Sequence, residues 1–291
     1  MSKRKALFII NPKSGQQRGK TVARTLEKKL DPSLYDWNVY YTKGPGDAAI
    51  KSKSAANKMD TVVAVGGDGS VNEVARGLIG SRSVLGIIPV GSGNGLARYL
   101  KIPMRIPDAI GLLNNGHIKK IDTLMINNEL MLNTAGVGFD ARVAHEYSRY
   151  VHRGISSYVK SVLKEIVRYQ EKKYKLYFEN KAVQEEAFLL TLSNSSQYGN
   201  NFYISPQAKI DDGFFEVCLI KKFPPWAAPI IVLRLLNKTI DQSKYYTCYK
   251  CKELVLDLEE DEEAQIDGEA VTLPKKIQVK LNPHSLKVIT G

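Results

Sequence analysis

One glycine-rich stretch, Thr61 to Val74, constrains the fold of this chain more than any other. Its first part, Thr61 to Val65, is apolar without polar alternation, which is typical of a strand buried on both faces of a parallel sheet. Gly66-Gly67-Asp68-Gly69 ends that run, and a helical pattern follows. Ser70 and Glu73 have the spacing of a capping box, so we expect the helix to begin at Ser70.

This turn has the chemistry of a phosphate site. Glycines let a ligand approach the backbone, and the N-terminus of a helix offers N–H groups and the positive end of its dipole. A tight turn that binds nothing explains the motif equally well when it is considered alone. The rest of the chain has to decide between the two.

Two further strands end in loops of the same kind. The apolar segment Ala6 to Asn11 leads into Asn11–Gly15, and Val84 to Val90 leads into Gly91–Gly95. Strands and helices alternate as far as about Asn114, which predicts a parallel sheet with helices on both faces. Ligands of such sheets bind beyond the carboxyl ends of the strands. Three polar or glycine-rich loops at that edge favour a nucleotide-phosphate site over simple turns.

The pattern changes after about Ile121, where strand-like segments dominate. We expect a hairpin around Asn128-Glu129, a long strand from Tyr245 to Leu258, and a β-rich domain of the sandwich type. Leu286 to Ile289 can return to the first domain. The predicted fold is α/β plus β, with a nucleotide-binding domain over 1–121, which 283–291 can complete, and a substrate domain over 122–282.

The composition of the chain limits the classes of partner and the compartment that we expect for it. The 291 residues carry a formal net charge of +12, which predicts attraction to polyanions such as nucleotides, nucleic acid or an anionic membrane. No basic arm, zinc-finger spacing or aromatic RNA-binding motif is present, so a dedicated nucleic-acid binder is disfavoured. Three cysteines favour a reducing compartment. Cys248 and Cys251 have C-x-x-C spacing, but in a strand they point to opposite faces, and we interpret the spacing as chance.

The sequence also suggests a location. The start Met-Ser-Lys-Arg-Lys runs directly into a strand, which is not the pattern of a signal peptide. No apolar run approaches the roughly 18 residues of a transmembrane helix. We therefore expect a cytoplasmic protein. The apolar segment Phe223 to Leu233 is either a membrane-facing element or a core helix, and we favour the core helix.

Acidic residues next to glycine give candidate catalytic and metal sites. Asp267-Gly268-Glu269 is either an ordinary β-turn or a pair of carboxylates for general-base and cation-binding roles. Asp211-Asp212-Gly213 is either a turn or a loop that holds a hard cation through carboxylate and backbone oxygens. No P-loop motif of the G-x-x-x-x-G-K-[ST] type occurs.

Taken in order, these motifs resemble the diacylglycerol kinase catalytic-domain family, which includes bacterial soluble lipid kinases and the sphingosine and ceramide kinases. The resemblance covers nearly the whole chain. It rests on the following segments: Asn11–Gly15, Gly66–Ser70 with Asn72-Glu73, Pro89–Asn94, Gly136 with Gly138–Ala141, Asp211–Gly213 and Ile266–Glu269. It implies a nucleotide-binding domain like that of phosphofructokinases and NAD kinases, followed by a β-sandwich.

The resemblance also implies roles for residues. Asp68 would hold the Mg²⁺ network, and Asp267 or Glu269 would be the base on the lipid hydroxyl. Asp212 would hold a structural Mg²⁺ with the backbone oxygens of Lys209 and Phe214. The ATP-binding candidates are Asn11, Lys13, Thr42, Gly66, Gly67, Asp68, Gly69, Ser70, Asn72, Glu73, Ser92 and Asn94, with Arg149 as a further phosphate contact.

Two departures leave the acceptor open. Gly95 stands where bacterial diacylglycerol kinases have an acid, so Ser92-Gly93-Asn94 looks more like the sphingosine-kinase branch. Arg142, however, replaces a carboxylate that is frequent in that branch.

We therefore expect an ATP- and Mg²⁺-dependent lipid kinase that is peripheral to an anionic membrane, acts on diacylglycerol or a sphingoid-type lipid, and binds no nucleic acid. A homodimer is compatible with this hypothesis. The alternatives are an NAD kinase-like enzyme, which shares the G-G-D-G motif, and a catalytically silent nucleotide- or membrane-binding module.

Overall fold

The computed structural model describes residues 3–15, 19–138, 171–199 and 201–291. The chain forms two compact units. Unit 1 comprises Met1–Asp122 and Pro283–Gly291, and unit 2 comprises Thr123–Asn282. The domain boundaries predicted from the sequence lie between residues 121 and 122 and between residues 282 and 283. Among the described residues, no helix is both long and apolar enough to cross a membrane.

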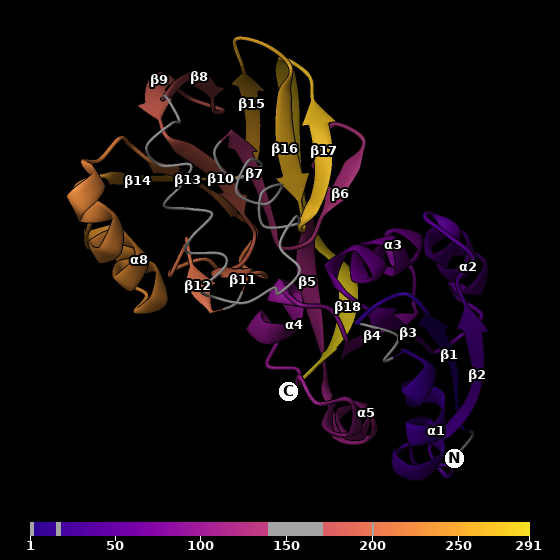
Figure 1. Ribbon diagram of the computed structural model, residues 1–291. Helices are drawn as coiled ribbons and strands as arrows, with labels where there is room; N and C mark the ends of the chain where they lie inside the picture. Colours follow the sequence, from indigo (N-terminus) through magenta and orange to yellow (C-terminus); the bar gives the residue numbers. More distant parts are fainter. Residues whose placement is uncertain (1–2, 16–18, 139–170, 200) are drawn as a thin grey trace. The chain divides into compact units, whose positions relative to one another are not determined.

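Unit 1 is built on a parallel sheet with the strand order β2-β1-β3-β4 (Figure 1). These strands are β2 (Tyr35–Tyr41), β1 (Arg4–Ile10), β3 (Thr61–Gly66) and β4 (Val84–Pro89). Every residue of β3 and β4 is buried, which confirms the expectation drawn from their unbroken apolar pattern. Covering both faces of these strands with helices is what removes them from water.

Helices lie on both sides of this sheet. Helix α2 packs with α3, and α1 packs with α5, and Figure 1 shows the strands between the two pairs. The helices of unit 1 are α1 (Gly19–Lys29), α2 (Asp47–Ala55), α3 (Asp68–Leu78), α4 (Gly95–Tyr99) and α5 (Ile106–Asn115). The predicted α/β class of the first domain is correct.

Unit 2 is an antiparallel β-sandwich, as predicted. One sheet has the order β14 (Tyr246–Cys251), β13 (Phe215–Ile220), β10 (Leu189–Ser193), β7 (Thr134–Gly138), β16 (Glu262–Ile266) and β17 (Glu269–Leu273). In the other sheet, the first part of β18 (Lys276–Thr290) is joined by β15 (Glu253–Asp257), β8 (Lys172–Tyr177), β9 (Ala182–Ala187), β5 (His117–Ile126) and β6 (Glu129–Met131). Buried side chains from both sheets, including Leu190, Val217, Leu256 and Ile277, form one core. Alternating burial along strands such as β15 places one face on this core.

Strand β5 begins in unit 1, which includes Asp122, and continues into unit 2. Two further short strands of unit 2, β11 (Gln197–Gly199) and β12 (Phe202–Tyr203), pair with each other. Between β13 and β14 lie the short 3-10 helices η1 (Pro225–Ala227) and η2 (Ile240–Gln242), with α8 (Ala228–Leu236) between them.

One expectation about strands needs correction. The segment Tyr245 to Leu258 is not one strand: β14 pairs with β13, whereas β15 pairs with β18 and β8 in the other sheet. The chain changes sheets at Lys252, and a local pattern of apolar residues cannot signal such a corner. The last strand, β18 (Lys276–Thr290), is continuous, and its residue Val288 pairs with Leu85 of β4 in unit 1.

Candidate active site

The three predicted loops of unit 1 do converge at the carboxyl ends of β1, β3 and β4, which are neighbours in the sheet. The Asn11 side-chain amide donates a hydrogen bond to Ser70 Oγ at 3.3 Å, and this bond joins the first loop to the second. The backbone N–H of Asn94 donates to Asp68 Oδ2 at 2.7 Å, which joins the third loop to the second. Asp68 is therefore held at the centre of the three loops.

Glycine is required where the second and third loops touch. A Cβ atom on Gly91 would lie 2.6 Å from Gly67 Cα, closer than non-bonded carbon atoms can approach. In the first loop, Gly15 has a φ of +59°, and a Cβ there would lie 2.2 Å from the carbonyl oxygen of Val90. The glycines thus permit close packing of three backbones, and this packing also exposes N–H groups to a ligand.

The N-terminus of α3 lies in this loop cluster, but it is built differently from our expectation. The helix begins at Asp68, with Gly67 as its N-cap and no side-chain cap. The predicted capping box of Ser70 and Glu73 is therefore wrong. Because no side chain caps the first turn, its N–H groups face the loops, where an anion can bind them.

Glu73 serves another helix. Its carboxylate accepts hydrogen bonds from the backbone N–H groups of Gly46 at 3.0 Å and Ala48 at 3.2 Å, at the N-terminus of α2. A carboxylate in this position satisfies N–H groups that have no partner within the helix. This contact gives Glu73 a structural role in joining α2 to α3, which its spacing from Ser70 did not predict.

The other nucleotide candidates of unit 1 surround the same loops. Lys13 is exposed, and its backbone N–H donates to Asn11 Oδ1 at 3.0 Å. Asn94 is buried with a φ of +54°, and its side-chain amide donates to the carbonyl oxygen of Gly91 at 2.7 Å, which closes the third loop. Ser92 is exposed in that loop, Thr42 follows β2, and Asn72 lies in the first turns of α3. Arg149 lies outside the described residues.

In unit 2, Asp267 and Gly268 form the two-residue turn of the β16–β17 hairpin, in which Ile266 pairs with Glu269. Both turn residues have positive φ, +50° and +84°, as a type I′ turn requires. The Asp-Gly pair is therefore a β-turn, which was one of the two interpretations of this motif. The turn also determines where the two carboxylates lie.

The two carboxylates have different environments. Asp267 is 6% exposed, and its oxygens accept hydrogen bonds from the backbone N–H groups of Leu132, Asn133 and Thr134 at 2.9, 2.8 and 3.2 Å. These bonds attach the hairpin to the segment that joins β6 to β7. Glu269 is exposed at the start of β17. Asp267 therefore has a structural role, whereas the carboxylate of Glu269 is accessible to a substrate.

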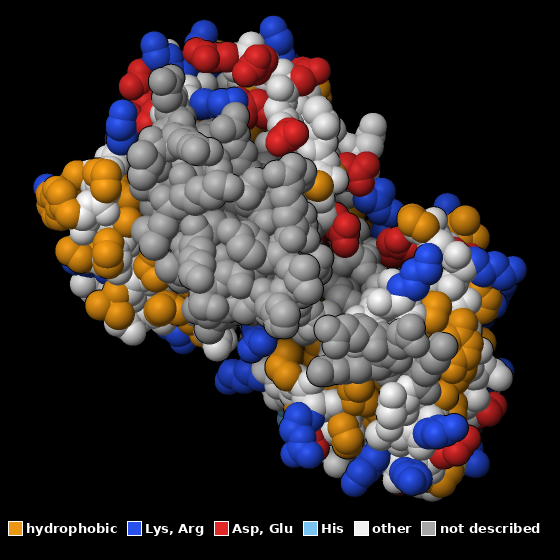
Figure 2. Space-filling model, in the orientation of Figure 1, with side chains coloured by type: hydrophobic (Ala, Val, Ile, Leu, Met, Phe, Trp, Pro, Cys, Tyr) orange, Lys and Arg blue, Asp and Glu red, His pale blue; other side chains and the backbone are white. Residues whose placement is uncertain are grey.

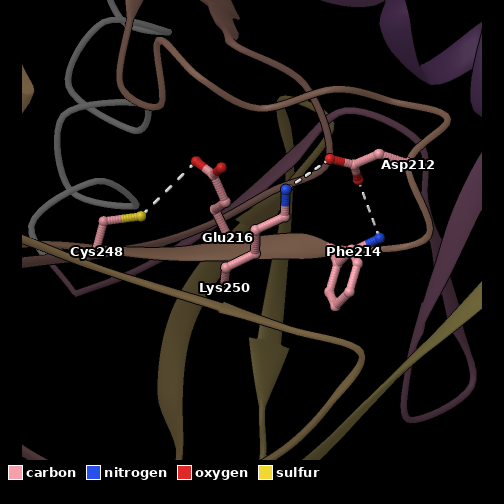
Figure 3. A network of polar contacts seen from close by, with 5 residues as sticks. All are labelled: Asp212, Phe214, Glu216, Cys248 and Lys250. Atoms are coloured by element: carbon pink, nitrogen blue, oxygen red, sulfur yellow. Dashed lines mark hydrogen bonds and ion pairs between the residues drawn. The ribbon is translucent and has the colours of Figure 1, made fainter.

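Asp212 lies in the loop before β13, where Lys250 of β14 neutralises it (Figure 3). Lys250 Nζ lies 2.6 Å from Asp212 Oδ2, and the backbone N–H of Phe214 donates to Asp212 Oδ1 at 3.1 Å. The ammonium group also lies 5.0 Å from the centre of the Phe214 ring.

Two family models together cover most of the chain. The model described as the diacylglycerol kinase catalytic domain matches residues 5–126, and the model described as the YegS C-terminal NAD kinase beta sandwich-like domain matches residues 133–290. The chain belongs to the diacylglycerol kinase catalytic-domain family. This confirms the resemblance drawn from the ordered motifs.

Named proteins of this family are distant relatives. A diacylglycerol kinase of Staphylococcus epidermidis is 29% identical over 225 residues, which are 76% of this chain and 71% of the relative, and one of Staphylococcus aureus matches to the same extent. The crystal structure of a diacylglycerol kinase from Bacillus anthracis strain Sterne has a TM-score of 0.76 at 25% identity, covering 100% of this chain and 98% of that one. Membership makes this chain one of a family of ATP-dependent kinases.

The structural magnesium site implied by the family resemblance was assigned to Asp212, Lys209 and Phe214. In this member of the kinase family, an ammonium group already lies against the carboxylate, and the backbone N–H of Phe214 donates to it. A dication at Asp212 would have to displace Lys250. The arrangement at Asp212 therefore lends no support to a resident Mg²⁺, and that assignment stays a prediction.

In this kinase-family chain, Cys248 and Cys251 lie as their spacing predicts, and Cys218 lies next to Cys248. Cys248 is exposed and Cys251 is buried, so the C-x-x-C pair does point to opposite faces of β14. Burial raises the pKa of Cys251 to about 12, which makes it an unreactive thiol. Cys218 lies directly opposite Cys248 on β13 with the two sulfurs 3.9 Å apart, and the Glu216 carboxylate lies 3.7 Å from Cys248 Sγ. These three side chains could ligate a soft cation, and strand pairing alone brings them together.

Proposed function

We propose that this chain transfers the γ-phosphoryl group of Mg-ATP to the hydroxyl group of a membrane lipid. The acceptor best supported by its relatives is diacylglycerol, which would give phosphatidic acid. The observation that carries the proposal is the convergence of three loops and the α3 N-terminus around Asp68 in unit 1. The staphylococcal relatives and the Bacillus structure are named diacylglycerol kinases, which supports this acceptor over a sphingoid-type lipid.

The loops of unit 1 suit the charge of a triphosphate. Backbone N–H groups of the glycine-rich loops and of the first turn of α3 are hydrogen-bond donors whose positions are set by the fold before the nucleotide arrives. Lys13 and Asn11 add a cation and an amide at the edge of the first loop. Phosphoryl transfer depends on such positioning and charge neutralisation more than on covalent chemistry by the protein.

Asp68 is our candidate ligand for the magnesium ion of Mg-ATP. Its Oδ2 accepts the N–H of Asn94, and this bond orients the carboxylate among the three loops. A carboxylate is the ligand that Mg²⁺ most often takes from a protein when nucleotide phosphates supply others. Bound there, the ion would neutralise charge on the phosphates.

Glu269 is our candidate for the general base. An alcohol is scarcely ionised at neutral pH, so a carboxylate has to accept its proton as the oxygen attacks phosphorus. The environments of the two carboxylates that the sequence left as alternatives support this choice: Asp267 is buried among three N–H donors, and Glu269 is exposed. We therefore propose that Glu269 accepts the proton of the lipid hydroxyl and that Asp267 has a positioning role.

A transfer assay tests the function. The protein would be incubated with γ-labelled ATP, Mg²⁺, NAD and mixed micelles that contain diacylglycerol, a sphingoid base or ceramide. Asp68→Asn and the control Asp36→Asn, which changes an exposed acid elsewhere in unit 1, would be assayed beside the wild type. We expect labelled phosphatidic acid from the wild type and the control only. Label in NAD but in no lipid would overturn the proposal in favour of a soluble acceptor, and ATP binding without transfer to any acceptor would overturn it in favour of a silent module.

A further inference from the structure

The outer face of η1 and α8 carries a stripe of large apolar side chains in contact with water. Trp226 is 70% exposed, Ile230 is 50% exposed and Leu233 is 57% exposed. Their spacing of four and then three residues places Ile230 and Leu233 on one side of the helix, with Trp226 one turn before them. We call these three residues the α8 stripe. Figure 2 shows hydrophobic side chains gathered where Figure 1 places α8.

The inner face of the same helix is also apolar. Ala228 and Ile231 are buried, and Ile231 packs in a cluster with Phe188, Ile204 and Ile240. Arg234 is the only charged residue of α8. A helix on the surface of a protein normally presents polar side chains to water, and one that is apolar on both sides is normally covered on both. The expectation of a buried core helix is thus only half right, because the inner face alone is buried.

The stripe sits on a well-supported scaffold. The Phe223 ring packs edge-on against Phe188 with ring centres 5.6 Å apart and lies 6.1 Å from the ring of Tyr245. The N–H of Ala227 donates to the carbonyl oxygen of Pro224 at 2.8 Å, and Arg234 Nη1 donates to the carbonyl oxygen of Thr239 at 3.0 Å. The ring contacts therefore attach the start of the segment to the sandwich, and the two hydrogen bonds fix the turns at either end of α8. The apolar side chains are presented by a defined surface rather than by a loose loop.

The charges around the stripe indicate its partner. Between residues 221 and 244 the chain has five basic residues (Lys221, Lys222, Arg234, Lys238 and Lys244) and one acidic residue, Asp241. Lys222, Lys238 and Lys244 are exposed. Lys238 Nζ lies 4.4 Å from the centre of the Tyr203 ring, which holds this ammonium beside the C-terminal end of α8. An apolar face that includes tryptophan and is bordered by lysine is the pattern of segments that lie in the interface of an anionic bilayer.

We propose that the α8 stripe and its flanking lysines form the surface by which this protein docks onto an anionic lipid bilayer. The apolar side chains enter the headgroup region, and the lysines contact the lipid phosphates. This inference rests on the proposed function only for the purpose of docking, because a lipid kinase has to reach its substrate in the membrane. The docking itself follows from the exposed apolar face and the surrounding charge.

Vesicle binding tests the docking directly. The probe is sedimentation with vesicles of phosphatidylglycerol and phosphatidylcholine, compared with vesicles of phosphatidylcholine alone. The test variant is the pair Ile230→Asp with Leu233→Asp. The control pair is Ile50→Asp with Ile118→Asp, which adds the same charge at isoleucines that are 72% and 60% exposed in unit 1. All four side chains are exposed, so circular dichroism and melting temperature should match those of the wild type.

We expect the stripe variant to bind phosphatidylglycerol vesicles about tenfold or more weakly than the control pair. In a Trp37→Phe background, Trp226 is the one remaining tryptophan, and its emission should shift to shorter wavelength when anionic vesicles are added. Equal vesicle binding by the stripe and control variants would overturn the proposal. So would a wild-type dimer in buffer that the stripe variant abolishes while vesicle binding is unchanged, because the stripe would then contact a second copy of the chain.

Activity separates this proposal from the proposed function. The stripe variant should lose turnover of long-chain diacylglycerol in phosphatidylglycerol vesicles and keep turnover of a short-chain diacylglycerol dispersed in water. If no form of the protein phosphorylates any lipid, the lipid-kinase proposal fails, and the vesicle-binding comparison still decides whether the α8 stripe docks. If both variants bind vesicles equally but the kinase is active, docking fails and the function stands.

Discussion

An acid precedes a glycine at the start of α3 in unit 1 and in the β16–β17 turn of unit 2, and the two acids have different roles. In unit 1, Asp68 begins α3 and lies among three loops, where one oxygen accepts the N–H of Asn94. In unit 2, Asp267 occupies a tight hairpin turn and accepts three backbone N–H groups. A carboxylate surrounded by N–H donors from its own fold has a structural role. An acid-glycine pair thus occurs both at a helix N-terminus and in a hairpin turn, and the surroundings decide whether the acid can meet a ligand.

The largest expected effect concerns Glu269, the exposed partner of Asp267. Glu269→Gln removes the proposed base and should lower the turnover rate about 10²- to 10⁴-fold. Because the side chain is exposed, the free energy of unfolding should change by less than about 0.5 kcal/mol. The control is Glu263→Gln, an exposed glutamate on the same hairpin, which should leave the rate unchanged. Steady-state rates and urea unfolding give both quantities. Unchanged turnover in Glu269→Gln would remove this residue from the mechanism.

Asp267→Asn tests the structural half of the comparison. The amide group of asparagine would turn a donor toward a site with three N–H donors, and the free energy of unfolding should fall by about 3 kcal/mol. Asp261→Asn is the graded control, because Asp261 is exposed and accepts one backbone N–H, from Lys275 at 2.9 Å. Urea unfolding of both variants measures the difference. Full stability with lost turnover in Asp267→Asn would instead point to a direct catalytic role.

Gly91→Ala tests whether the close packing of loops around Asp68 matters. The added Cβ would lie 2.6 Å from Gly67 Cα, so the second and third loops have to separate. We expect a loss of stability of about 1–3 kcal/mol and weaker binding of ATP. Gly111→Ala is the matched control. Nothing lies within 4 Å of its added Cβ in α5, and the helix should become more stable by roughly 0.5–1 kcal/mol. Thermal unfolding and nucleotide titration measure the two effects. Unchanged nucleotide affinity in Gly91→Ala would separate this packing from the binding site.

The smallest expected effect is a pH dependence at Glu216, which lies beside Lys250 and Cys248 (Figure 3). Burial raises the pKa of Glu216 above its ordinary value of 4.5, and the nearby Lys250 charge opposes that rise. The ionised form is therefore less stable in the folded state than in the unfolded state. The stability of the wild type should fall, relative to Glu216→Gln, as the pH rises from 4.5 through the raised pKa. Urea unfolding at several pH values would measure this, and a difference that is constant with pH would contradict the shift.

Much of unit 1 could be predicted because its signals are local. Unbroken apolar strands followed by glycine-rich loops allow few arrangements, and parallel strands bring their carboxyl ends to one edge. The helix start was predicted two residues late, because the Ser70 and Glu73 spacing has a competing use: Glu73 reaches the N-terminus of α2. When a side chain caps a neighbouring helix, the spacing of residues in its own helix does not indicate this contact.

Unit 2 was less predictable because its contacts join residues far apart in the chain. Leu132 and Asp267 are 135 positions apart, and no local pattern relates them. Lys250 meets Asp212 because β14 pairs with β13, so the neutralised carboxylate could not be foreseen from the Asp-Asp-Gly turn. The same is true of Cys218 and Cys248, which the strand register places opposite each other.

The sequence by itself determined the family and the two-part architecture, since apolar period, glycine position and motif order are properties of neighbouring residues. It also supplied the candidate residues for a nucleotide site. Only the tertiary structure decided that Asp68 lies at a junction of loops, that Asp267 is enclosed by backbone donors while Glu269 is exposed, and that one face of α8 meets water. Burial and hydrogen-bond partners depend on which distant segments pack together, and that is determined when the whole chain folds.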